Sequence, residues 1–316
     1  MYFQILEKLS PLYMNILLGY LASRILKTPR DTIATLMFFL INPLVLFNGI
    51  IHTKIDVSTL SLPIIIFCIA SALCFIFYKI GKKIWSDSTT NLLAFNAGTG
   101  NSGYFGLPLA LILFDNQGEG VYLMSIIGLG LYDNSVGFYA CAKGNFSSKE
   151  CLKQIAKLPT IYAFAAGLIF HYLAIPIPTI FKEFMCHIKG TYTVLGMMIL
   201  GLGIATLRNF LLDIKFITLT FLVKFLIWPL TIFTLIFLDK NFFCFYNDTI
   251  YQALILLSIV PLAVNSVVLA SLLDTQPEKA AAAVLLSILF ALLYVPFMVI
   301  YFIIDPNNLP NLYRCY

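Results

Sequence analysis

Apolar residues form long runs along nearly the whole chain, and short polar stretches separate these runs. A helix needs about 20 mainly apolar residues to cross a bilayer. The pattern therefore predicts an all-α integral membrane protein. We expect ten transmembrane helices, over residues 9–27, 32–51, 60–80, 91–114, 120–142, 155–174, 190–207, 214–238, 249–273 and 279–303.

Composition agrees with this interpretation. Hydrophobic residues make up 60% of the chain and charged residues 11%, and the mean hydropathy is +0.91. A soluble domain carries about 25% charged residues. The net charge of +5 is better explained by basic loops than by nucleic acid, since no Lys- and Arg-rich run with interleaved aromatic residues occurs.

The basic residues also predict the topology. Loops after the first, third, fifth, seventh and ninth spans hold thirteen Lys and Arg residues, against six on the opposite side. Because Lys and Arg collect in cytoplasmic loops, both termini should face outward. We see no cleavable signal peptide. The compact loops favour the bacterial inner (plasma) membrane.

A basic loop in the middle of the chain divides the spans into five plus five. We expect a first five-helix repeat over 1–142, a cytoplasmic linker over 143–154 and a second repeat over 155–316. An odd number of spans per half inverts the second half relative to the first. The two repeats should therefore be inverted.

Helix-breaking residues interrupt the fourth span of each half. The first break, between Asn96 and Pro108, contains Gly98, Gly100, Gly103 and Gly106, and the second, between Val260 and Ser266, contains Pro261. Glycine and proline weaken a helix, and backbone freed at membrane depth needs partners that lipid does not offer. Paired breaks of this kind indicate the binding site of a secondary transporter. We therefore expect broken, crossing helices 4 and 9.

The breaks supply the candidate substrate-binding residues. Half-helix N-termini that meet near the midplane suit a carboxylate, and Asn amides can donate hydrogen bonds to it. The candidates are Asn101, Asn265, Gly100, Gly103, Pro108 and Pro261. The alternative is that the glycines permit tight helix packing and the asparagines cap a kink.

Asp133 and Lys224 are the ionisable residues that fall well inside predicted spans. Charge at membrane depth is costly and marks a functional hypothesis. Asp133 could carry a coupling proton or help to hold a cation, and Lys224 could pair with it or serve as the counter-charge of an anion. A structural salt bridge, or a Lys224 side chain that snorkels, stays open. Asn42-Pro43 predicts a kink in the second span, where Asn42 or Asn48 could line a cavity.

Other chemistries have no support in the sequence. Cysteine and histidine do not occur at metal-ligand spacing, so we expect no metal site and no cofactor. DDxxD, HExxH, GxSxG and P-loop motifs are absent, which argues against an intramembrane enzyme and against a pump that acts alone.

With these residues identified, the chain resembles the auxin efflux carrier family, within the superfamily that also includes the bile acid sodium symporters and the arsenite and riboflavin transporters. The marks of the resemblance cover nearly the whole chain: Gly19-Tyr20, Asn42 to Phe47, Gly100 to Pro108, Lys224 to Leu230, Pro261 to Asn265, and Ser287 to Pro296.

The resemblance implies ten helices in two inverted five-helix repeats, with an organic anion held at the crossover by Asn101 and Asn265. The central loop is short, as in compact bacterial members of the family, which are associated with malate, malonate and other carboxylates. The resemblance therefore does not imply that plant auxin is the substrate. The resemblance does not determine whether transport is coupled to H⁺, to Na⁺ or to neither ion.

We therefore predict a secondary active or facilitative permease that carries a small organic anion across the lipid bilayer by alternating access. The alternatives are a sodium-coupled carrier like the bile acid symporters, and a nontransporting membrane receptor or assembly protein. A homodimer stays open, and the exact substrate and the direction of transport do not follow from the sequence.

Overall fold

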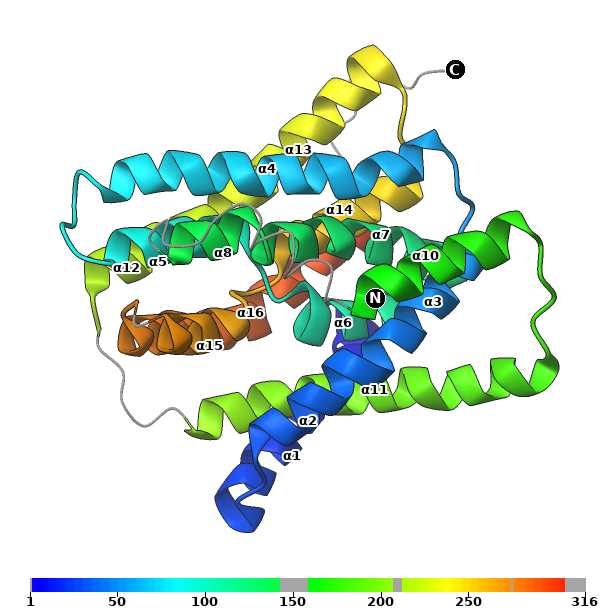
Figure 1. The fold of residues 1–316 in the computed structure, drawn as a ribbon, viewed down its shortest axis with the longest axis horizontal. Helices are drawn as coiled ribbons and strands as arrows, with labels where there is room; N and C mark the ends of the chain where they lie inside the picture. Colours follow the sequence, from blue (N-terminus) through cyan, green and yellow to red (C-terminus); the bar gives the residue numbers. More distant parts are fainter. Residues whose placement is uncertain (1, 143–158, 207–211, 274, 305–316) are drawn as a thin grey trace.

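The computed structural model describes residues 2–142, 159–206, 212–273 and 275–304. Every regular element among these residues is helical (Figure 1). The prediction of an all-α fold is confirmed for this part of the chain. Labels η mark short π-helical segments, most of which continue an α-helix without a turn between them.

The elements follow one another along the chain with short connections. The first ten are α1 (Tyr2–Leu26), α2 (Arg30–Leu36), η1 (Met37–Ile41), α3 (Asn42–His52), α4 (Val57–Gly81), α5 (Thr89–Gly98), η2 (Ser102–Gly106), α6 (Leu107–Leu113), α7 (Asn116–Asp133) and α8 (Val136–Cys141). The next ten are α10 (Pro159–Tyr172), α11 (Thr179–Thr206), α12 (Ile214–Leu222), η3 (Val223–Ile227), α13 (Trp228–Leu238), η4 (Asp239–Phe243), α14 (Asp248–Ile259), α15 (Asn265–Leu272), α16 (Pro277–Met298) and η5 (Val299–Ile304).

Five helical stretches of the described chain are long and apolar enough to cross a membrane. They are Arg30–His52, Val57–Gly81, Thr179–Ala205, Ile214–Phe243 and Pro277–Ile303. They coincide with the second, third, seventh, eighth and tenth predicted spans. The fourth, fifth and ninth predicted spans are each divided between shorter helices. The complete set of ten spans, and the inverted repeat, stay predictions.

The predicted spans and the observed helices differ both inside a span and at a helix end. The span predicted over 120–142 is interrupted between α7 and α8, where the side chains of Asn134 and Ser135 bond to the carbonyls of Gly130 and Leu131. Such side-chain bonds compete with the helical hydrogen-bond ladder. Helix α11 begins at Thr179 and not near 190, because hydropathy marks the apolar part of a helix and not its ends.

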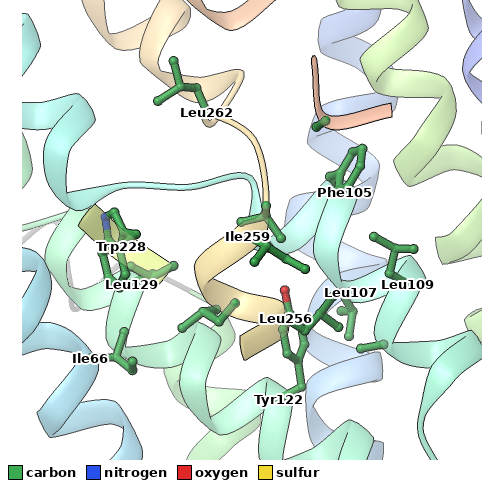
Figure 2. Close-up of a cluster of buried hydrophobic side chains, with 14 of the residues drawn as sticks. Ile66, Phe105, Leu107, Leu109, Tyr122, Leu129, Trp228, Leu256, Ile259 and Leu262 are labelled. Atoms are coloured by element: carbon green, nitrogen blue, oxygen red, sulfur yellow. The ribbon is translucent and has the colours of Figure 1, made fainter. Parts of the chain in front are cut away.

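The hydrophobic core surrounds the places where the two interrupted helices meet. Helix α14 packs against α7 and η2. Figure 2 shows Leu256 and Ile259 of α14 among side chains of the first interrupted helix and of α7, including Leu107 and Tyr122. These side chains are at most 1% exposed. The core therefore holds both interrupted helices in place.

The bundle has two ends that matter for the site. One end, here the Lys279 end, carries residues 82–88, 212–213 and 275–279 and lies at the left of Figure 1. There the Lys279 Nζ lies 3.0 Å from Asp213 Oδ2 and 3.9 Å from Asp87 Oδ2. The opposite end, here the Glu119 end, carries residues 53–56, 114–119 and 173–178. By the count of basic residues, the Lys279 end is the predicted cytoplasmic end.

Candidate functional site

Both predicted breaks occur, and they touch. The first separates α5 from η2 at residues 99–101, and the second separates α14 from α15 at residues 260–264. The backbone N–H of Asn101 donates a hydrogen bond to the carbonyl of Pro261, with an N···O distance of 2.8 Å. The two interrupted helices therefore meet break to break, although about 160 residues of chain separate them.

Protein groups satisfy much of the backbone that the breaks release. The Asn101 carbonyl accepts hydrogen bonds from the N–H groups of Phe105 and Gly106. In the second break, the N–H of Leu262 donates to the hydroxyl of Ser287 on α16. This pattern follows from the absence of hydrogen-bond partners in lipid.

A cavity of about 690 Å³ lies at the crossing. Most of its wall is apolar, from side chains of α3, α7, α10 and α15, among others. The polar side chains of the wall are Asn42, Asn101, Ser102, Tyr104, Asp133, Asn134, Thr160, Tyr192 and Asn265. A mostly apolar cavity with a few convergent polar groups is the usual form of a small-molecule site.

The structure brings most of the predicted site residues to this cavity. Gly100, Asn101, Gly103, Asp133 and Asn265 line it. Gly103 lies inside η2 and not in the break itself.

The remaining candidates lie off the cavity wall. Pro108 is buried in the first turn of α6, Pro261 accepts the bond from Asn101, and Lys224 lies behind the first break. Of the two asparagines near Pro43, Asn42 lines the cavity and the buried Asn48 does not.

Several buried polar atoms at the first break lack a hydrogen-bond partner. They include the amide nitrogen of Asn101 and both amide atoms of Asn96. The hydroxyl of Thr99 lies close to the carboxylate of Asp133. Thr99 Oγ1 and Asp133 Oδ1 nevertheless form no well-aligned hydrogen bond. Buried polar groups are nearly always paired, so this cluster indicates a place where a ligand, an ion or water binds.

Lys224 is buried, with 1% of its surface exposed, and therefore does not snorkel. Its Nζ lies 3.4 Å from the Thr99 carbonyl oxygen and 5.0 Å from the centre of the Trp228 ring. The Trp228 indole donates to the Ala97 carbonyl at 2.8 Å. A Cβ on Gly100 would collide with Lys224 Nζ, so glycine at this position lets the amine approach the backbone.

Other residues near the site carry little or no signal in the sequence. Tyr192 is one tyrosine in the apolar part of α11 and lines the cavity. Arg30 begins α2, interacts electrostatically with Tyr104, and has a buried Nε without a partner. Trp228 could have been predicted from the sequence as a neighbour of Lys224, because it lies four residues later and therefore on the same face of a helix.

The cavity extends toward one end of the bundle. Phe138, Thr160 and Leu269 belong to its wall, and each lies a few residues from a helix end at the Lys279 end. At the Glu119 end, Lys189 Nζ of α11 lies 2.6 Å from Glu119 Oε2 of α7. An ion pair therefore joins α7 to α11 at the Glu119 end, while the wall of the cavity reaches toward the Lys279 end.

These features define the class of the protein. Apolar helices long enough to cross a membrane, with two interrupted helices that meet beside a polar cavity, are the architecture of a membrane transporter.

The comparisons agree with this class. Residues 4–130 match the family described as Membrane transport protein, and residues 190–308 match the Sodium Bile acid symporter family. The chain is also 24% identical, over 248 residues, to an uncharacterized transporter of Methanocaldococcus jannaschii. The matched region covers 75% of this chain and 77% of that protein. The resemblance stated from the sequence is thus confirmed: the matches indicate a membrane transporter, similar in its first part to the auxin efflux carrier family and in its second part to the bile acid symporters.

Proposed function

We propose that the chain is a secondary active or facilitative carrier that moves a small organic anion, a carboxylate, across the membrane by alternating access. One observation carries the proposal. The Asn101 amide nitrogen is buried without a partner at the wall of the cavity, at the point where the two broken helices touch. A carboxylate oxygen is the acceptor that this donor lacks.

The surroundings of Asn101 suit the same ligand. Asn265 begins α15, is exposed to the cavity and can donate a second hydrogen bond. The N-terminus of a helix carries partial positive charge, which favours an anion. Apolar wall residues such as Leu123 and Ile126 can contact the hydrocarbon part of the substrate.

Asp133 restricts how an anion can bind. Its carboxylate lines the same cavity, and two negative charges repel each other strongly in a site of low dielectric constant. We therefore assign to Asp133 the role of a proton carrier, which is neutral while the substrate is bound. Transport in Asp133→Asn should lose its dependence on a pH gradient, and an unchanged pH profile would contradict this role.

Alternating access is supported by the unequal ends of the cavity. It extends toward the Lys279 end, while the Glu119–Lys189 ion pair lies across the opposite end. A Cβ on Gly120 would collide with Thr53, which indicates close packing of α3 against α7 there. With the predicted topology, we interpret this arrangement as an inward-facing state, and in the proposed cycle the Glu119 end separates to give the opposite state.

The test is flux of labelled mono- and dicarboxylates into proteoliposomes. Asn101→Ala and Asn265→Ala should each lose saturable flux and keep the thermal stability of a folded protein. Asn241→Ala is the matched control, because the Asn241 amide bonds to the Phe237 carbonyl outside the cavity. Equal flux in all four proteins would refute the site. Binding of an acid without flux would favour the nontransporting receptor.

A second candidate is a sodium-coupled carrier. The match of residues 190–308 to the Sodium Bile acid symporter family favours it. Flux measured with and without a sodium gradient separates the two candidates.

A further inference from the structure

The carboxyl end of α5 is an electronegative site inside the protein. The last carbonyl groups of a helix have no partner within the helix, and they carry partial negative charge. In transporters with interrupted helices, such ends and the unwound carbonyls beside them hold the coupling cation. Helix α5 ends at Gly98, and the Thr99 backbone beyond it is extended. The Ala97 and Thr99 carbonyls therefore need donors or a cation.

Here a side chain supplies the positive charge. The Lys224 ammonium lies 3.4 Å from the Thr99 carbonyl oxygen, and the Trp228 indole N–H bonds to the Ala97 carbonyl. Both residues come from the helix that runs through η3 into α13. Lys224 and Trp228 are at most 1% exposed, so water does not screen the charge from the carbonyls.

The other contacts of the ammonium are those of a bound monovalent cation. The Trp228 ring lies 5.0 Å away, within the range of a cation–π interaction. Asp133 interacts with it electrostatically and links it to the cavity. Gly100 leaves space for the amine, since a Cβ there would collide with Nζ. A free sodium ion at this point would be repelled by the ammonium at short range.

We propose that the Lys224 ammonium is a built-in cation that fills the position of a coupling sodium ion at the crossing. The chain then moves its substrate without sodium. This inference rests on the proposed carrier function for its role in transport, but the cation site itself can be tested on the purified protein without a substrate.

The first test measures thermal unfolding of the full-length protein in NaCl and in choline chloride of equal ionic strength. The wild type should unfold at the same temperature in both salts. Lys224→Ala should be destabilised in choline chloride and regain part of its unfolding temperature in NaCl, or in ethylammonium chloride, whose amine can enter the vacated space. The ion binds the folded state only, so it should stabilise this variant by mass action.

Lys79→Ala is the matched control, because Lys79 also lies over an aromatic ring, that of Phe75, but on α4 and away from the crossing. It should show no difference between sodium and choline. A sodium-specific stabilisation of the wild type, or a folded Lys224→Ala protein that responds neither to sodium nor to ethylammonium, would overturn the inference.

Lys224→Gln keeps a long side chain with an N–H donor and removes only the charge, so it replaces the alanine variant in these tests if that variant does not fold. Lys224→Gln should lack flux. Wild-type flux should change by less than about twofold when choline replaces sodium. Sodium-dependent wild-type flux overturns the inference. If no acid is transported at all, the proposed function fails, and the unfolding measurements still decide whether Lys224 fills a cation site.

Discussion

Gly100→Ala is the smallest change that should displace Lys224. The new methyl group would collide with Lys224 Nζ and would lie 3.2 Å from Val260 Cγ2. The amine must then leave the Thr99 carbonyl and the Trp228 ring. A hydrogen bond from a charged donor contributes about 1.5–3 kcal/mol, and a desolvated cation–π contact contributes up to about 2 kcal/mol.

Loss of both contacts costs about 2–5 kcal/mol, and the reduced freedom of the unfolded chain offsets about 0.4–1 kcal/mol of this loss. We therefore expect Gly100→Ala to be destabilised by about 1–4 kcal/mol. The measurements are thermal unfolding of the purified protein and, in proteoliposomes, flux of the transported acid. Flux should fall together with stability, because the displaced amine no longer lies beside the cavity.

Gly130→Ala is the matched control. Gly130 lines the same cavity from α7, and a Cβ there would have no atom within 4 Å. Alanine in a helix interior should stabilise this variant by about 0.5–1 kcal/mol. If Gly100→Ala unfolded at the wild-type temperature and kept its flux, the amine would not lie against Gly100, and the reasoning on Lys224 would be refuted.

Two further predictions concern the ends of the bundle. Burial raises the pKa of Asp213, but hydrogen bonds from the Phe216 N–H and from Lys279 outweigh this effect and hold the pKa below its ordinary value of 3.8. Asp213→Asn keeps the helix cap and loses the ion pair, so it should be less stable by about 1.5–3 kcal/mol at neutral pH. The stabilisation from a lowered carboxyl pKa is complete above the ordinary value of 3.8 and is lost as the pH falls through the lowered pKa. The difference in stability between wild type and Asp213→Asn should therefore shrink below pH 3.8 in thermal scans, and a constant difference would contradict the assignment. The second prediction concerns the Glu119 end, where a variant with both Glu119→Cys and Lys189→Cys can be cross-linked by a reducible bifunctional reagent. The cross-link should stop flux, and its reduction should restore flux. Flux that persists in the cross-linked protein would show that this end need not open.

The sequence was sufficient to predict the features that depend on local composition. Long apolar runs exclude a soluble fold, and glycine and proline weaken a helix locally, although Pro63 and Pro296 lie inside the continuous helices α4 and α16. Both breaks therefore occur where expected, at residues 99–101 and 260–264. Asn101 and Asn265 lie at these breaks, and both line the cavity. The family resemblance could be found for the same reason, since its marks are short local motifs.

Tertiary packing determines the contacts between residues that are far apart in the sequence, and no local pattern encodes these contacts. The contact between Asn101 and Pro261 joins residues far apart in sequence. The position of the Lys224 amine depends on Trp228, the Thr99 carbonyl and the space at Gly100. An intramembrane lysine could pair, snorkel or bind an anion, and the sequence alone does not select among these. Residue type and order determine where a helix breaks, whereas the partners of a freed backbone or a buried charge depend on which other elements lie beside it.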